Sequence, residues 1–255
     1  MEIRALGTSG GIGAGLRTTA LLIDGRLLID AGSGVGDLAL DEIRAVREVL
    51  ITHAHLDHVA FLGLMADSRI GTGAPPLHVH APAEALAALR EHMLNDRLWP
   101  DFTRVPDPDD PVLVLHALPE AGGLELEGYR MAPLPAAHGV PAVGYAVDDG
   151  RAALAFSGDT GPCPALWQAL QRLPRLDALI VECALPDALA GLGGRIGHYT
   201  PAALAADAAQ LPPGARLWIT HLKPAERERI AAELTAHGLL EAGGELLHCG
   251  ERRVL

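Results

Sequence analysis

Residues 51–58 read Ile-Thr-His-Ala-His-Leu-Asp-His, so the end of an apolar strand runs directly into a dense group of metal-binding side chains. These side chains are His53, His55, Asp57 and His58. Zinc prefers imidazole and carboxylate ligands in tetrahedral sites, and a single ion would not use all four comfortably. Two neighbouring ions that share a water form a hydrolytic centre. The stretch therefore predicts a pair of metal ions.

Three further candidate ligands stand at comparable strand ends. His138 follows the apolar run 131–137, and Asp159 closes the segment Ala-Phe-Ser-Gly-Asp. His221 ends Leu-Trp-Ile-Thr-His, which repeats the strand-then-Thr-His pattern of the first stretch. Functional side chains are often carried on loops that a rigid scaffold positions. We therefore expect these residues to join the first four along one edge of the fold.

Apolar runs and turn residues predict a strand-rich first half and a second half in which helices and strands alternate. Strands are expected at 2–6, 19–23, 26–30, 48–52, 77–81, 112–117, 124–127, 129–135, 142–147, 152–156, 177–181 and 215–220, with a final strand pair at 245–255. Helices are expected at 41–47, 59–66, 83–94, 164–172, 201–210 and 225–236. Pro82 suits a first helical position, and the proline-rich segment 99–111 is expected to be irregular.

This pattern of elements favours an α/β architecture in a single domain over residues 1–255. Two mixed β-sheets packed face to face, with helices outside, would bury its apolar surfaces. The hairpin between the second and third strands is expected at Asp24-Gly25. The glycine-rich loop 7–15 is either a phosphate-binding loop or a mobile surface turn.

The charge balance restricts the partners. The chain has 20 basic and 32 acidic residues, a net charge of −12, which disfavours long polyanions but allows a small anionic substrate beside metal ions. Its three cysteines form no paired framework, so reduced thiols and a cytoplasmic location are expected. No signal peptide is apparent, and the long uncharged run 131–147 contains prolines, glycines and a histidine, so no membrane span is expected.

The pattern His-x-His-x-Asp-His, followed by His, Asp and His at long spacings, resembles the metallo-β-lactamase superfamily over essentially the whole chain. The resemblance implies an αββα four-layer sandwich. It also implies that His53, His55 and His138 hold one ion, that a second is held by Asp57, His58 and His221, and that Asp159 bridges both. Relatives that use di-iron place Glu where this chain has His55. Two Zn²⁺ ions are therefore expected, with Mn²⁺ as the second candidate.

Within the superfamily, the chain is similar to the class II 3′,5′-cyclic-nucleotide phosphodiesterases. The similarity rests on residues 52–59, 98–103, 137–145 and 156–160. The chain departs from that family's signature at Phe61, where a small residue is usual, and at Ser68, which Arg69 follows. The resemblance implies hydrolysis of a phosphodiester in a small molecule, a cyclic nucleotide (cAMP or cGMP) that becomes a nucleoside 5′-monophosphate.

The resemblance also suggests catalytic roles for three residues. Asp57 is expected to orient the attacking hydroxide as well as to bind metal. In the related tRNA 3′-processing endonucleases, a paired Glu and His protonate the leaving group, and Glu182 and His198 stand at comparable positions here. The alternative is that His198 only starts a helix and that Glu182 lies on the surface. Asp30 is expected either to accept the second N–H of a ligating histidine or to cap a turn.

Three other functions compete with the cyclic-nucleotide reading. An RNA-processing endonuclease of this superfamily carries a long arm between the third metal histidine and the bridging aspartate, but here His138 and Asp159 are only 21 residues apart. An arylsulfatase-type enzyme would act on a sulfate ester, which presents the same tetrahedral anion to a dinuclear centre. A non-catalytic metal-binding module would keep the ligands without turnover. A substrate panel is the observation that separates these readings.

Several other residues are expected to have a structural role. Tyr145, Trp99 and Phe102 are expected in the core, with base stacking as the alternative. The remaining histidines are expected to be packed or surface residues rather than ligands. They are His78, His80, His92, His116, His237 and His248. Residues 83–111 are candidates for a lid or for the interface of a homodimer.

Overall fold

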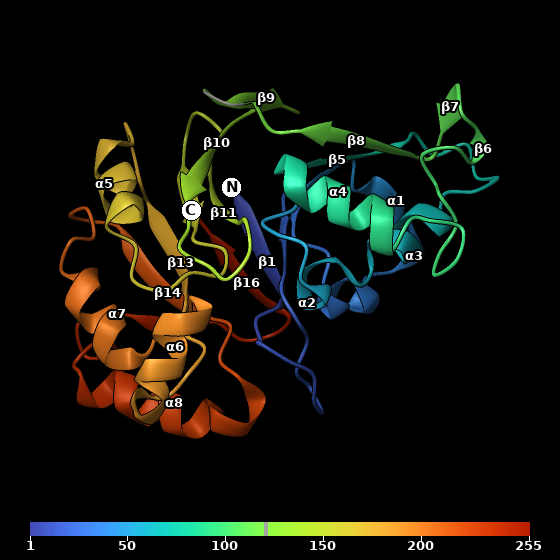
Figure 1. Cartoon of the computed structure of the whole chain (residues 1–255). Coiled ribbons are helices and arrows are strands. Elements are labelled where there is room, and N and C mark those ends of the chain that lie inside the picture. Colours follow the sequence, from blue (N-terminus) through green and yellow to red (C-terminus); the bar gives the residue numbers. More distant parts are fainter. Residues whose placement is uncertain (120–121) are drawn as a thin grey trace.

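Two seven-stranded sheets face each other in the computed structural model, which describes residues 1–119 and 122–255 (Figure 1). The first sheet has the order β16 (Glu251–Val254), β1 (Glu2–Gly7), β2 (Ala20–Ile23), β3 (Leu27–Ile29), β4 (Glu48–Leu50), β5 (Leu77–Ala81) and β8 (Leu113–Ala117). The second has the order β15 (Glu245–Leu246), β14 (Arg216–Thr220), β13 (Ala178–Glu182), β12 (Ala153–Phe156), β11 (Val143–Asp148), β10 (Tyr129–Pro135) and β9 (Leu124–Leu126). Both sheets mix parallel and antiparallel pairs.

Helices cover the outer face of each sheet, which confirms the predicted four-layer sandwich. On the first sheet lie α1 (Leu40–Ala45), α2 (Leu56–Val59), α3 (Leu62–Asp67) and α4 (Ala83–His92). On the second lie α5 (Pro164–Arg172), α6 (Ala190–Ile196), α7 (Pro201–Ala208) and α8 (Arg227–Ala236). Among the described helices, none is long and apolar enough to cross a membrane. The three cysteines are free thiols.

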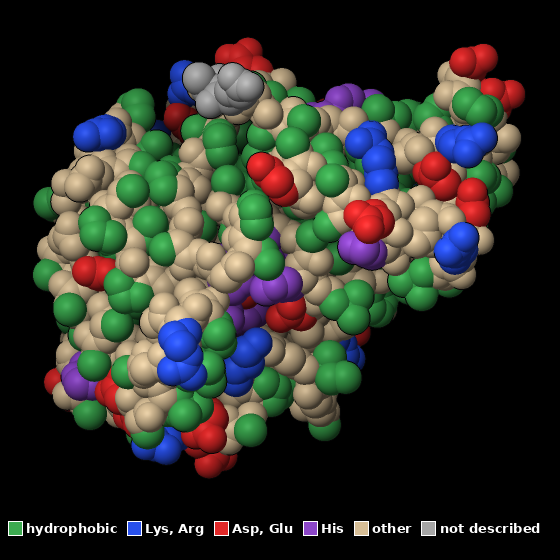
Figure 2. Space-filling view, viewed as in Figure 1, with side chains coloured by type: hydrophobic (Ala, Val, Ile, Leu, Met, Phe, Trp, Pro, Cys, Tyr) green, Lys and Arg blue, Asp and Glu red, His purple; other side chains and the backbone are tan. Residues whose placement is uncertain are grey.

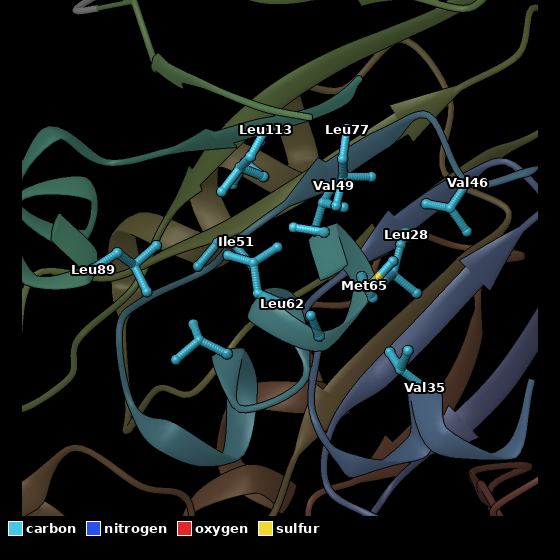
Figure 3. Packing of buried hydrophobic residues seen from close by; sticks show 14 of the residues in the cluster. Leu28, Val35, Val46, Val49, Ile51, Leu62, Met65, Leu77, Leu89 and Leu113 are labelled. Atoms are coloured by element: carbon cyan, nitrogen blue, oxygen red, sulfur yellow. The ribbon is translucent and has the colours of Figure 1, made fainter. Parts of the chain in front are cut away.

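The central strands are apolar on both faces because each face is covered. In β2, Leu22 faces the helices, whereas Leu21 and Ile23 face the second sheet. Figure 3 shows the helix-facing layer, in which Leu62 of α3 packs close to strand residues of the first sheet. Trp218 from β14 is buried in the layer between the sheets. Burial of each large apolar side chain contributes roughly 1.5–3 kcal/mol to folding.

The structure corrects four local predictions. The helix expected at 59–66 is two helices, α2 and α3, and α2 begins at Leu56, so it includes part of the histidine stretch. Pro82 is the residue before α4 rather than its first residue. The proline-rich segment contains a short antiparallel ribbon, β6 (Pro106–Asp107) with β7 (Asp110–Pro111). The two final strands do not pair with each other, because β15 joins β14 and β16 joins β1.

Candidate dinuclear metal centre

The seven predicted ligand residues converge at one edge of the sandwich, from both halves of the chain. The first sheet supplies the residues after β4, some of them in α2, and the second sheet supplies the ends of β10, β12 and β14. The side chains form two groups, in each of which one ligand atom per residue lies within 4.8 Å of the others. The groups are His53, His55, His138 and Asp159, and Asp57, His58 and His221. This division is the one that the family resemblance implies, except that the resemblance assigns Asp159 to both groups.

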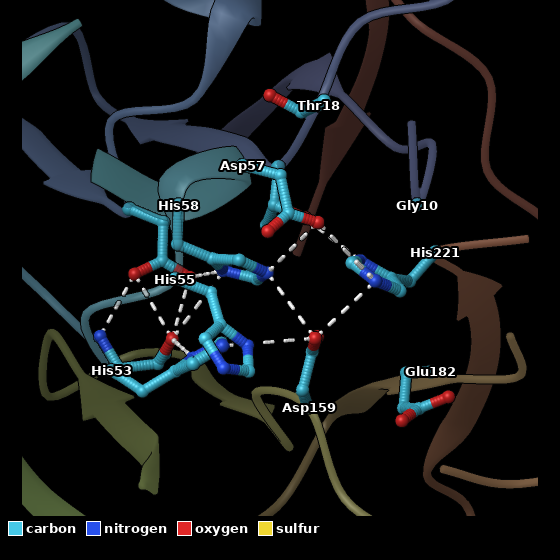
Figure 4. Close-up of polar contacts among 12 residues, drawn as sticks. Gly10, Thr18, His53, His55, Asp57, His58, Asp159, Glu182 and His221 are labelled. Carbon is cyan, nitrogen blue, oxygen red and sulfur yellow. Dashed lines mark hydrogen bonds and ion pairs between the residues drawn. The ribbon is translucent and has the colours of Figure 1, made fainter. Parts of the chain in front are cut away.

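The carboxylate of Asp159 lies between the two groups (Figure 4). Its Oδ2 is 3.3 Å from Nε2 of His58, 3.3 Å from Nε2 of His221 and 3.8 Å from Nε2 of His53. Asp57 lies farther out, with Oδ2 3.8 Å from Nε2 of His221. Asp159 therefore has the position that a bridging ligand requires.

Unsatisfied buried atoms test whether this arrangement fits metal ions. Within the described residues, four atoms at the centre have no hydrogen-bond partner, namely Nε2 of His53, His58 and His221 and Oδ1 of Asp159. Buried polar atoms are rarely left without partners, because their desolvation is costly. Divalent ions would satisfy all four, and imidazole with carboxylate is a donor set that suits zinc. The residues thus fit a metal pair, and their role as ligands stays a prediction.

Neighbouring polar groups hold the other ring nitrogen of four histidines, which fixes how the rings are turned. These Nδ1 contacts join His53 to Thr52 Oγ1 at 3.0 Å, His58 to Asp30 Oδ2 at 2.7 Å, His138 to the Gly197 carbonyl at 2.8 Å and His221 to Thr19 Oγ1 at 3.1 Å. The predicted contact between Asp30 and a candidate ligand is therefore present. Asp30 itself is fully buried, has a left-handed φ of 59° and also accepts hydrogen bonds from Thr52.

The electrostatics of the centre favour ligand-competent protonation states for His53, His221 and Asp159, but not for His58. Burial lowers the pKa of His53 and lowers that of His221 to about 3, which keeps these imidazoles neutral. Burial opposes ionisation of Asp159, but His221 and His58 together bring its pKa well below the usual range. His58 differs, because Asp159 and Asp30 raise its pKa even though burial opposes protonation. Metal binding needs neutral imidazoles and ionised carboxylates.

Glu182 and His198 form a buried pair beside the centre. Nδ1 of His198 lies 2.5 Å from Oε1 of Glu182, and the carboxylate also accepts backbone N–H groups from Thr160 and Ala184. The ring of His198 lies near those of His138 and His221, with centroids 5.0 Å and 5.7 Å away. Glu182 is fully buried, so the alternative that it is a surface carboxylate is wrong.

This pair holds a proton near neutral pH. Burial raises the pKa of Glu182 to about 7, although the hydrogen bond with His198 opposes the shift. Burial tends to lower the pKa of His198, but its hydrogen bond and charge interaction with Glu182 outweigh this and raise it. A histidine whose pKa is raised by an adjacent carboxylate is suited to general acid catalysis.

Lys223, the only lysine in the chain, was not predicted as a site residue. It follows His221 by two residues, and its Nζ donates a hydrogen bond to the carbonyl of Gly10 at 2.8 Å. A Cβ at Gly10 would lie 2.6 Å from the backbone oxygen of His221, so only glycine fits there. Among the described residues, no carboxylate forms an ion pair with Lys223. The signal available in the sequence was that the only lysine lies two residues after the candidate ligand His221.

Contacts of this kind tie the glycine-rich loop to the centre. The backbone N–H of Gly10 donates to the Leu222 carbonyl at 3.2 Å, and Ser9 forms a bridge with Leu222. The loop is therefore anchored beside His221 in the structure. Figure 2 shows histidine side chains gathered in a hollow on this face of the molecule, with basic side chains close by.

The residues expected to be structural are packed in the core or grouped away from the centre. Tyr145 and Phe102 are each 1% exposed, and the Tyr145 hydroxyl donates to the Ile51 carbonyl at 2.8 Å. Base stacking on these two rings is therefore excluded by burial. His78, His80 and His116 contact one another on β5 and β8 instead of joining the seven.

Comparison with known families identifies the class of protein. The family model for the beta-lactamase superfamily domain matches residues 25–222, and the chain belongs to this family. The superfamily comprises metal-dependent hydrolases.

Particular relatives agree with this class and divide between two activities. A probable 3′,5′-cyclic-nucleotide phosphodiesterase of Yersinia pestis is 25% identical over 88% of this chain and 78% of its own length. Ribonuclease Z of Pyrococcus abyssi is 28% identical over 49% of this chain and 40% of its own length, and ribonuclease BN of Escherichia coli is 27% identical over 87% of this chain and 89% of its own length. Unliganded yeast PDE1 has the same fold, with a TM-score of 0.80 at 18% identity, covering 100% of this chain and 99% of its own. The predicted similarity to cyclic-nucleotide phosphodiesterases is confirmed.

Proposed function

We propose that this protein hydrolyses a phosphodiester in a small molecule, with a 3′,5′-cyclic nucleotide as substrate and a nucleoside 5′-monophosphate as product. The observation that carries the proposal is the buried Glu182–His198 pair beside the seven converging side chains. Such a pair supplies what an alkoxide leaving group needs, a positioned proton. The similarity to the Yersinia phosphodiesterase supports a cyclic-nucleotide substrate, and the choice over RNA rests on the site and the charge of the chain.

Two divalent ions, with zinc favoured by the donor set, would be held by the residues that the family resemblance assigned. One ion would be held by His53, His55 and His138, and the other ion would be held by Asp57, His58 and His221. Asp159 would be a ligand of both ions. When bound, such ions supply a nucleophile at neutral pH and offset the charge that develops on the phosphoryl oxygens.

The protein's own residues then orient the reaction. Asp57 is partly exposed at the outer side of the cluster, where its carboxylate can accept a hydrogen bond from an attacking water. His198 would give its proton to the departing sugar oxygen, and Glu182 fixes the ring through Nδ1. The carboxylate also stabilises the charged imidazole, because both groups are buried.

A small substrate fits this site better than a long RNA. The segment between His138 and Asp159 contains only β11 and β12, which pair as one antiparallel hairpin, so no arm projects there. The net charge of −12 disfavours a polyanion. The ribonuclease relatives keep RNA cleavage as the second candidate, which precursor tRNA as a substrate tests.

The test is a substrate panel with purified protein loaded with Zn²⁺ or Mn²⁺. The panel contains cyclic AMP, cyclic GMP, bis(p-nitrophenyl) phosphate, an aryl sulfate and precursor tRNA. We expect the highest kcat/KM with a cyclic nucleotide. Faster turnover of the aryl sulfate or of precursor tRNA would overturn the proposal, and so would metal-loaded protein that cleaves none of the compounds.

Lys223 is expected to bind the substrate's anionic group, because it is an unpaired cation beside His221 in a strongly acidic protein. Lys223→Gln should raise KM by about 10-fold to 100-fold with a smaller change in kcat, since hydrogen bonds to charged groups contribute roughly 1.5–3 kcal/mol. Inorganic phosphate should inhibit the variant correspondingly less. Arg227→Gln, which removes a partly exposed cation from α8, is the control. An unchanged KM would show that Lys223 only anchors Gly10.

A further inference from the structure

A second hollow adjoins the metal centre on the side of His55. Its volume is about 260 Å³, and it lies between α4 and two loops of the centre. It is lined by Ala54, His55, Glu84, Ala85, Ala88, Val140 and Pro141. Whole small-molecule sites usually occupy about 300–1,000 Å³, so this hollow suits one group of a ligand whose reacting part lies at the centre.

The walls of this hollow are small and apolar. Three of the lining residues are alanines, two of them on α4, and their short side chains leave the space open. Val140 and Pro141 close it from the loop that follows His138. Small apolar walls beside a reactive centre favour an apolar ring over a flexible polar group.

Glu84 is the one acidic residue that lines the hollow. Its side chain is exposed, and within the described residues it forms no ion pair. An ionised carboxylate only accepts hydrogen bonds, so beside an anionic substrate it lowers affinity unless the substrate offers N–H donors to it. The two oxygens of a carboxylate match two adjacent donors. Guanine presents such a pair on one edge, at N1–H and at its amino group, whereas adenine presents one amino donor beside an acceptor nitrogen.

We infer that the hollow beside His55 holds the base of the nucleotide substrate, and that Glu84 makes the site prefer guanine over adenine. This inference rests on the proposed function and deepens it. The base lies against the alanines of α4, and the phosphodiester then reaches the centre from the side of His55. The carboxylate of Glu84 accepts hydrogen bonds from the edge of the guanine ring.

The experiment measures two properties of the metal-loaded protein. One is kcat and KM for cyclic GMP and cyclic AMP, and the other is the calorimetric affinity for 5′-GMP and 5′-AMP. Glu84→Gln removes the carboxylate, and Ala88→Leu fills the hollow. The matched controls lie on the same helix outside the hollow, Glu91→Gln for the charge and Ala87→Leu for the volume.

The wild-type protein should prefer the guanine compounds by about 10-fold or more in kcat/KM and in affinity, because paired hydrogen bonds to a base edge discriminate to that degree. Glu84→Gln should bring the ratio close to one. Ala88→Leu should raise KM for both cyclic nucleotides about 10-fold or more, with kcat less affected. The two control variants should behave as the wild type.

The outcomes separate this inference from the proposed function. Turnover of both cyclic nucleotides with no effect of Glu84→Gln or Ala88→Leu would overturn the inference and leave the function standing. Binding of 5′-GMP over 5′-AMP that depends on Glu84, in a protein that cleaves no cyclic nucleotide, would support the hollow as a guanine site and reject the function. Preference for adenine, or no binding of either nucleotide, would also overturn the inference.

Discussion

Asp159→Ala is expected to lower kcat for the preferred phosphodiester by at least about 10³-fold and to reduce the bound metal from about two ions per chain to less than one. The reason is its position, since it belongs to the group with His53, His55 and His138 and its Oδ2 also lies 3.3 Å from Nε2 of both His58 and His221. Elemental analysis of the purified variant measures the metal, and steady-state kinetics measures the activity.

A second readout makes this prediction independent of turnover. Zinc should raise the melting temperature of the metal-free wild type, because a ligand present at 1,000 times its Kd stabilises the native state by about 4 kcal/mol. The same addition should stabilise the Asp159→Ala variant much less. Asp109→Ala, on the exposed turn of the β6–β7 ribbon, is the control. A variant that keeps two ions and full activity would refute the bridging role.

His198→Ala is expected to lower kcat for a cyclic nucleotide by about 10²-fold to 10⁴-fold and to leave KM nearly unchanged. The loss should be much smaller with bis(p-nitrophenyl) phosphate, because p-nitrophenolate departs without a proton. Glu182→Gln should show the same dependence on the leaving group in weaker form, since it keeps a hydrogen-bonding partner for His198. Parallel kinetics with the two substrates measure the difference.

The comparison between substrates distinguishes proton donation from a structural role. The ring of His198 also lies near those of His138 and His221, so its removal could disturb the ligands. A disturbed metal centre would slow both substrates equally, and it would also lower the metal content. Equal losses would therefore reject His198 as the proton donor. His92→Ala, an exposed histidine at the end of α4, should change neither rate.

The sequence predicted most strands because their apolar runs are continuous, and such runs need two covered faces. The Asp24-Gly25 turn was also predictable from local sequence, because Asp-Gly favours a tight hairpin, and both residues have the positive φ that such a turn requires. The sequence did not predict which strands pair with each other. The segments at 245–246 and 251–254 both have local strand character, but nothing local specifies that they join different sheets.

The errors around α2 have a tertiary cause. The backbone N–H of Phe61 donates to the Ala31 carbonyl at 2.9 Å, and that of Ala31 donates to the His58 carbonyl at 2.7 Å. These long-range bonds coincide with the break between α2 and α3. A helix at 190–196 was also missed, because its three glycines disfavour helix formation and only packing offsets that preference.

The candidate site also contains residues that the sequence predicted and residues that it did not. The seven predicted ligands were found because each follows an apolar strand, and the fold brings strand ends together. The Glu182–His198 contact depended on the family resemblance, and the structure supplied its geometry. The sequence did not predict the contact of Lys223 with Gly10 or the position of Glu84 beside His55. In both cases the neighbours come from distant segments that meet only in three dimensions.

The division of the ligand residues between the two sheets has a mechanical consequence. Four come from the half that contains β4 and three from the half that contains β10, β12 and β14, so bound ions would fasten one sheet to the other. Thermodynamic linkage is reciprocal. Chelation should therefore speed amide exchange at the interface between the sheets, and a cavity made there, as in Trp218→Ala, should weaken metal affinity from a distance.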